Sequence, residues 1–192
     1  MANGCNTIRL YSFQTDVVYQ VLKRDGVCYS KEEYVRKKYK ESAKVFINAY
    51  GWFVKEAQYI VPKPEGAEYP YWAFTDLYNV DQTGDGHVLT LDVPIGEAIL
   101  FDMFDWTKIM QMHYIGENES EESAFSEELK NMGMNEFQIM TSNFYPEQKA
   151  RIQESWKRLF GHQQAIEAGD NSGVHSVQAG LWCIKGEWIV KE

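Results

Sequence analysis

The chain of 192 residues lacks a long hydrophobic run: none approaches the length of about 20 residues that a membrane-spanning helix needs. Its three cysteines, Cys5, Cys28 and Cys183, lie far apart and show neither CxxC nor Cys/His spacing. An odd number of widely spaced cysteines is typical of reduced thiols, and the N-terminal residues lack the pattern of a signal peptide. We therefore expect a cytoplasmic protein with no membrane contact and no metal site.

Motifs of common enzyme classes are also missing. The sequence has no GxSxG, P-loop or GxGxxG motif, and its four histidines lack metal-ligand spacing. Residues 81–86 imitate the start of a calcium loop, but strands are expected on both sides of them and Leu89 occupies a ligand position. These absences argue against serine proteases, kinases and dehydrogenases.

Positive charge is scarce. Nineteen Lys and Arg residues stand against 28 Asp and Glu residues, which gives a net charge of −9. A surface of this sign repels phosphate backbones, so binding to nucleic acid is not expected. A small anionic ligand remains compatible with this charge, because one or two local cations outweigh a distant net charge.

Aromatic residues, by contrast, are abundant, at 15% of the chain with 12 Tyr, 10 Phe and 6 Trp. So many rings favour a thick core, a stacking pocket, or both. Five rings, Phe46, Phe53, Phe125, Trp156 and Phe160, fall on apolar stripes of expected helices and are assigned to the core. Tyr11, Tyr71, Trp72 and Trp182 instead fall on expected strands, beside polar residues.

The hydrophobic periodicity predicts an α+β fold in a single domain over residues 1–192. Strands from the N-terminal, middle and C-terminal parts are expected to form a central mixed or antiparallel sheet with helices packed around it. The strands are expected at residues 7–13, 71–75, 87–93, 99–101, 174–184 and 188–190. Helices are expected at residues 16–25, 30–53, 106–114, 120–132 and 146–160. The Asp- and Gly-rich residues 81–86 predict a hairpin turn between the second and third strands.

Two glutamines in strand contexts indicate a ligand site. Gln14 ends a strand just before a helix whose free N–H groups favour an anion. Gln178 stands in an apolar late strand, where a buried amide either pairs with backbone or points into a cleft. We expect stacking by Tyr11, Tyr71, Trp72 and Trp182, amide contacts by Gln14 and Gln178, and phosphate binding by Arg9. The expected ligand is a nucleotide or an NAD-derived molecule, with no other cofactor.

Five segments in order carry a family resemblance: RLYSFQ at 9–14, YPYWAF at 69–74, DMFDW at 102–106, QESWKRLF at 153–160 and VQAGLW at 177–182. Together they resemble a bacterial and phage family, the domain of unknown function 3841. This resemblance covers nearly the whole chain but implies no established chemistry.

The plan of the chain is also distantly similar to the ADP-ribosyltransferase-like fold. That resemblance implies NAD held by an Arg or His on the first strand and a Glu at the head of a late strand. Here Ser12 stands in the His position, Arg9 is offset from the usual Arg position, and Gln178 stands in the Glu position. An amide cannot stabilise an oxocarbenium-like transition state as a carboxylate does.

The leading hypothesis is therefore a non-catalytic protein that binds or sequesters an NAD-derived or cyclic-nucleotide signal. The alternative is a divergent ADP-ribosyltransferase or NAD glycohydrolase, in which Asp105 or Glu187 replaces the missing Glu. A third hypothesis is a protein-interaction module. The sequence leaves the oligomeric state open.

Overall fold

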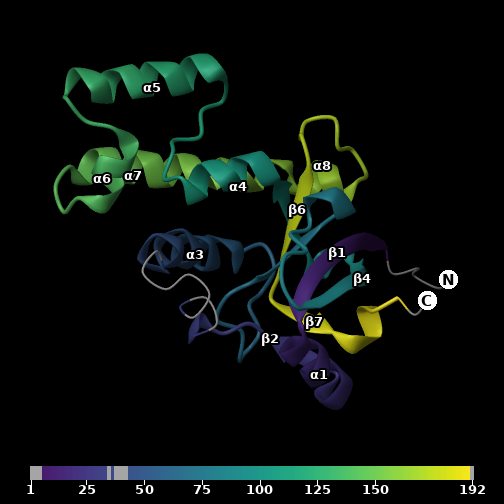
Figure 1. The fold of residues 1–192 in the computed structure, drawn as a ribbon. Coiled ribbons are helices and arrows are strands. Elements are labelled where there is room, and N and C mark those ends of the chain that lie inside the picture. Colours follow the sequence, from purple (N-terminus) through teal and green to yellow (C-terminus); the bar gives the residue numbers. More distant parts are fainter. Residues whose placement is uncertain (1–5, 34–35, 37–42, 191–192) are drawn as a thin grey trace.

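A computed structural model describes residues 6–33, 36 and 43–190, and its core is a five-stranded antiparallel sheet. The strand order is β4-β1-β3-β6-β5, and a smaller sheet pairs β2 with β7 (Figure 1). The strands are β1 (Thr7–Thr15), β2 (Val27–Tyr29), β3 (Tyr71–Phe74), β4 (Gly86–Pro94), β5 (Ile99–Asp102), β6 (Val177–Leu181) and β7 (Cys183–Lys185). The predicted α+β class is confirmed.

Helices surround the large sheet, and α5 and α6 lie at one end of the molecule, away from it (Figure 1). The α-helices are α1 (Asp16–Asp25), α3 (Ala43–Ala57), α4 (Met103–Met110), α5 (Glu119–Asn131), α6 (Glu136–Thr141), α7 (Pro146–Ser155) and α8 (Gln163–Glu167). Short 3-10 turns are η2 (Leu77–Asn79), η3 (Ile95–Glu97), η4 (Trp156–His162) and η5 (Gly186–Trp188).

The signal that ends α1 is the glycine that the sequence indicated. Gly26 adopts a left-handed φ of 75° and its N–H donates to the Leu22 carbonyl. A residue without a Cβ adopts this conformation at little cost, which explains why the helix ends there. The long helix predicted at residues 30–53 falls partly outside the described residues; Glu32, Glu33 and Arg36 are helical, and α3 begins at Ala43.

The predicted hairpin at residues 81–86 is wrong. Strand β1 lies between β3 and β4, pairing with β4 along its whole length and with β3 at Tyr11 and Phe74. The segment that joins β3 to β4 is long enough to cross the end of β1, so the two strands are neighbours in sequence but not in the sheet.

The C-terminal strands also differ from the prediction. The expected strand at 174–184 is divided at Trp182, and β7 leaves the large sheet to pair with β2. The expected strand at 188–190 is absent, because Trp188 lies in η5 and Ile189 makes only an isolated bridge with Leu91. The Gly186 N–H donates to the Gly26 carbonyl at 2.7 Å, which ties this turn to the end of α1.

The large sheet separates two hydrophobic clusters. We call the side covered by α3, α4 and η4 the helical face, and the side covered by α1, α8 and the small sheet the opposite face. Phe53, Phe125 and Trp156 are buried in the cluster of the helical face and Phe160 packs against it, as the helical stripes predicted. Most of the aromatic surplus therefore forms core.

Gly51 gives a direct test of the described part of α3. It is exposed in the helix interior, and a Cβ added there would meet nothing within 4 Å. We expect Gly51→Ala to raise the free energy of unfolding by about 0.5–1 kcal/mol, measured by urea denaturation. Gly26→Ala is the control, since it has equal space but a φ of 75° and should destabilise. Equal effects of the two substitutions would contradict this account.

Candidate functional site

Side chains alternate between the two faces of a sheet, and this alternation divides the predicted site residues. Gln14 and Tyr71 lie on the opposite face. Four others lie on the helical face: Arg9, Tyr11, Trp72 and Gln178. Trp182 follows β6 and contacts Phe53 on this face, with 6.4 Å between the ring centres. The seven residues therefore do not meet in one cleft.

The two residues on the opposite face make contacts inside the protein. Gln14 Nε2 donates to Ser12 Oγ at 2.8 Å, and Ser12 in turn donates to the Trp72 carbonyl at 2.7 Å. Tyr71 is buried, with its hydroxyl 3.1 Å from Cys28 Sγ. These contacts give both side chains a structural role.

On the helical face, the strand register places two predicted site residues, Tyr11 and Gln178, in one row with Phe74 between them. Tyr11 pairs with Phe74 across β1 and β3, and Phe74 pairs with Gln178 across β3 and β6. Directly opposed side chains have Cβ atoms about 5 Å apart, so the three form a continuous line. We call Tyr11, Phe74 and Gln178 the aromatic row. Tyr11 and Phe74 are half-buried, whereas Gln178 is buried, so the row runs from the surface towards the core.

Gln178 is unusual among the buried polar residues. It is only 3% exposed, yet its amide makes no hydrogen bond to any residue that the structure describes. Among those residues no fully buried side-chain nitrogen or oxygen lacks a partner, so the small exposed part of Gln178 includes its amide. Its donor and acceptor are therefore available at the inner end of the row.

Arg9 lies at the outer end, two residues before Tyr11 on the same face. Its guanidinium bonds to both carboxylate oxygens of Asp92, at 2.5 and 3.0 Å. The hydrogen bond to Asp92 raises the pKa of Arg9, which keeps the guanidinium charged. Because both side chains are solvent-exposed, the ion pair is weak and a ligand anion can compete for Arg9.

Trp72 and Trp182 support the face from within the core. The Trp72 indole donates to Tyr50 Oη at 2.8 Å, and its ring lies 4.7 Å from that of Trp106. Trp182 is buried and donates to the Val61 carbonyl at 2.7 Å. Sequence reasoning missed Phe74, although it shares strand parity with Trp72 in the YWAF segment.

The sequence matches a known protein family over nearly its whole length. Residues 9–190 match the family described as Domain of unknown function (DUF3841). The chain belongs to this family. No curated protein and no solved structure matches it.

In this DUF3841 protein the chain beside Gln178 is held by a buried carboxylate. Asp102 ends β5, and its oxygens accept from the N–H groups of Phe104 and His175, both at 3.0 Å, and from His175 Nδ1 at 2.8 Å. Burial raises the pKa of Asp102, but these hydrogen bonds together outweigh it and leave the pKa lowered. Sequence reasoning missed this cap, and α4 begins at Met103 rather than Trp106 because of it.

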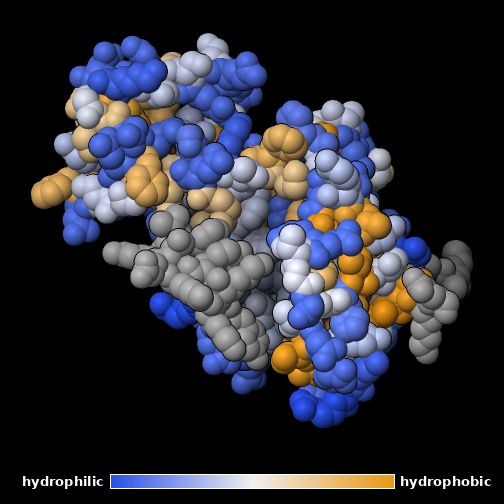
Figure 2. Space-filling model, viewed as in Figure 1, coloured by the Kyte–Doolittle hydropathy of each residue, from blue (hydrophilic) through white to orange (hydrophobic). Residues whose placement is uncertain are grey.

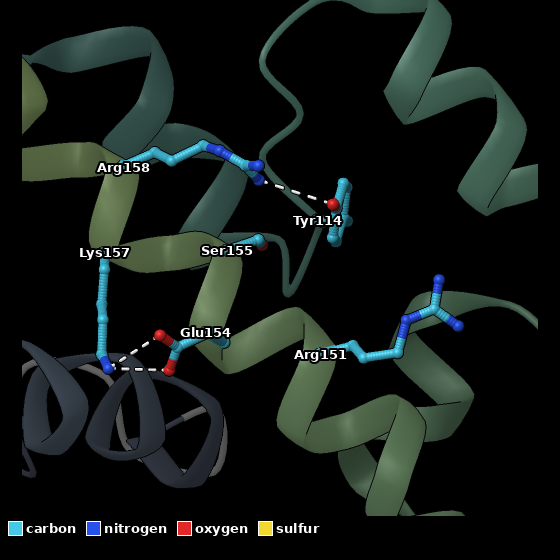
Figure 3. Close-up of a pocket in the computed structure, with 6 residues that line it drawn as sticks. All are labelled: Tyr114, Arg151, Glu154, Ser155, Lys157 and Arg158. Carbon is cyan, nitrogen blue, oxygen red and sulfur yellow. Dashed lines mark hydrogen bonds and ion pairs between the residues drawn. The ribbon is translucent and has the colours of Figure 1, made fainter.

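A cavity of ≈ 530 Å³ in the DUF3841 protein is lined by residues of η4 and α7 and by Tyr114 (Figure 3). Three cations line it, and each already has a partner. Arg151 bonds to Glu128 at 2.5 Å, Lys157 to Glu154 at 2.9 Å, and Arg158 to the Ile115 carbonyl at 2.7 Å. Figure 3 shows Lys157 turned towards Glu154 and away from Tyr114. A ligand anion would have to displace these contacts, so this cavity is a weaker candidate than the aromatic row.

The described residues of this DUF3841 protein include no group of three His, Cys, Asp or Glu side chains suited to hold a metal ion. No helix in the described part is long and apolar enough to cross a membrane. Cys28 and Cys183 are free, buried thiols, and burial raises the pKa of Cys183 to about 11.

Proposed function

We propose that this protein binds a small nucleotide-type ligand, of the NAD-derived or cyclic-nucleotide class, on the aromatic row. The observation that carries the proposal is Gln178, a largely buried residue whose amide is reached by solvent and makes no described hydrogen bond, at the inner end of two half-buried rings. No fully buried nitrogen or oxygen of the described side chains lacks a partner, so solvent reaches the Gln178 amide, and a ligand on the row would replace that solvent as its hydrogen-bond partner.

The chemistry of the row suits a nucleobase. Base–aromatic stacking contributes about 1–3 kcal/mol per base, which Tyr11 and Phe74 can supply. A glutamine amide offers a donor beside an acceptor, and nucleobase edges present the complementary pair. Arg9, on the same face, would contact the phosphate. The net charge of −9 favours a small ligand over a nucleic acid strand.

The free thiols support a reducing compartment, so we place this activity in the cytoplasm of a bacterium or in a phage-infected cell. The aromatic row contains no acid, base or nucleophile set for catalysis, so the protein would act by binding a nucleotide signal and sequestering it.

Calorimetry against NAD, ADP-ribose, cyclic AMP and cyclic GMP tests the proposal. We expect one of these probes to bind, with Gln178→Met and Phe74→Leu each weakening it about tenfold. Gln178→Met should leave the Tm unchanged or raise it, because the amide makes no described hydrogen bond that methionine would remove.

Phe144→Leu is the matched control, because Phe144 is exposed and lies between α6 and α7 rather than on the sheet. Absence of binding to all four probes would refute the proposal. Wild-type affinity in both row variants would show that a bound probe occupies another place.

A divergent ADP-ribosyltransferase or NAD glycohydrolase is the alternative. Its support is Asp105, a mostly buried carboxyl that lies 3.7 Å from Lys108 Nζ, although burial raises the pKa of Asp105 and so opposes the charged form that the missing Glu would supply. Glu187, the other candidate, lies in η5, which follows β7 and is not part of the large sheet that holds Gln178. Release of nicotinamide from NAD, abolished by Asp105→Asn, would favour this alternative over binding alone.

A protein-interaction module is the third candidate. Four large apolar residues are exposed on α6 and on the turns that flank α5, α6 and α7: Met132, Phe137, Phe144 and Tyr145. Figure 2 shows pale orange side chains among blue ones on that end of the molecule. Failure of both nucleotide tests together with a partner lost in Phe144→Ser would favour this function.

A further inference from the structure

A second cavity, of ≈ 210 Å³, lies beside the small sheet and shares no residue with the aromatic row. The rings of Tyr29, Trp182 and Trp188 form its walls, together with Val61 and Pro64. Its volume is larger than that of an apolar cavity that holds benzene, which is about 150 Å³. It is below the about 300–1,000 Å³ of pockets for drug-sized ligands. A single six-membered ring or a branched alkyl chain fits this size.

Two opposite charges line the same cavity. Lys185 Nζ donates to Glu97 Oε1 at 2.6 Å, and the two side chains are 31% and 41% exposed. Lys185 Nζ also lies 4.9 Å from the centre of the Trp188 ring. The hydrogen bond to Glu97 raises the pKa of Lys185, so the ammonium stays charged. An apolar cavity with a partly exposed ion pair is therefore present.

The hydrogen-bonding capacity of this site is not used up. An ammonium has three N–H donors and a carboxylate accepts at several positions, so the single bond between them leaves both able to bind further groups. The Trp188 indole N–H donates to no described residue, although the side chain is only 4% exposed. By contrast, the Trp182 indole donates to the Val61 carbonyl.

We propose that this cavity binds a free amino acid or a similar small zwitterion with an apolar side chain. The side chain enters between the rings, the ligand carboxylate accepts from Lys185 and the Trp188 N–H, and the ligand ammonium donates to Glu97. A ligand with only one charge would lie against the like charge of the pair, whereas a zwitterion satisfies both. This second site is independent of the nucleotide proposal.

Calorimetry with L-phenylalanine tests the site, with 3-phenylpropionate and 2-phenylethylamine as probes that each lack one charge. We expect L-phenylalanine to bind and each single-charge probe to bind about tenfold more weakly, since each probe lacks one hydrogen bond between charged groups. Lys185→Gln and Glu97→Gln should each reduce the affinity for L-phenylalanine by a similar factor.

Two further variants separate this site from a general effect of surface charge. Val61→Phe fills the cavity but keeps the backbone carbonyl that Trp182 needs, and it should abolish binding. Lys157→Gln breaks a more exposed ion pair, with Glu154, elsewhere on the surface and should leave the affinity unchanged. Thermal melts of all variants check folding.

Three results would overturn the proposal. They are the absence of binding at millimolar L-phenylalanine, equal affinity for a single-charge probe, and wild-type affinity in both Gln variants. Because none of these residues belongs to the aromatic row, either proposal can fail without the other.

Discussion

Asp102→Ala is expected to lower the free energy of unfolding by about 2–4 kcal/mol, the largest effect among our predictions. The substitution removes the cap of α4, which is the bond from the Phe104 N–H, and leaves the partly buried His175 N–H without its acceptor. Loss of the cap at Phe104 costs about 1 kcal/mol, and loss of the acceptor for the partly buried His175 N–H costs about 1–3 kcal/mol. Urea denaturation monitored by circular dichroism measures the change.

Two related variants separate the backbone contacts from the histidine ring. His175→Ala should cost less than about 1 kcal/mol, because the ring is 74% exposed and its backbone N–H still reaches Asp102. Asp102→Asn should lie between the two, since its amide oxygen still caps Phe104 but its NH₂ group cannot accept from His175. An equal loss in His175→Ala and Asp102→Ala would place the stabilisation in the ring instead.

The same carboxylate predicts a pH dependence. Because the hydrogen bonds leave the pKa of Asp102 below its unfolded value, its contribution is complete above the unfolded pKa, near 3.8. It is lost as the pH falls through the lower folded pKa. The difference in stability between wild type and Asp102→Asn should therefore shrink as the pH is lowered below about 4.

Gly180→Ala is expected to cost about 2 kcal/mol despite the small size of the added methyl group. A Cβ at this position would lie 2.8 Å from Cζ of Phe53 and 3.2 Å from its Cε1. The Phe53 ring cannot easily move, because it is fully buried against Trp72 and Trp106 at ring distances of 5.1 and 5.4 Å. Overpacking of a rigid core destabilises by about 1–3 kcal/mol.

A double-mutant cycle tests this cause. Phe53→Leu makes room for the new methyl group, so adding Gly180→Ala to it should cost clearly less than in the wild type. Gly96→Ala is the control, since a Cβ there meets nothing within 4 Å. Additive losses at residues 53 and 180 would show that the two do not compete for space.

Local signals in the sequence predicted local features well. Gly26 and Gly133 end α1 and the turn after α5, each with a positive φ, and the alternating residues 87–93 form most of β4. Gln178 also stood out correctly as an amide in an apolar strand. Strand parity carried further information, because Tyr11 and Gln14 are three residues apart and must lie on different faces of β1.

The remaining features depend on contacts between distant segments. The position of β1 between β3 and β4 follows from a crossover that residues 81–86 do not encode. Asp102 and His175 meet although 73 positions separate them, and the alignment of Phe74 with Gln178 depends on the register of β3 and β6. Neither pairing has a local sequence signal.

The strand order also has a consequence for synthesis on the ribosome. Strands β1, β3 and β4 emerge early, but β6 fills the place between β3 and β5 only after residue 181 has been made. Until then the nascent chain presents an open edge on β3, and β5 has no partner in the large sheet. Unpaired strand edges and exposed apolar surface favour aggregation, so β6 acts as the closing element without which the two halves of the sheet cannot join.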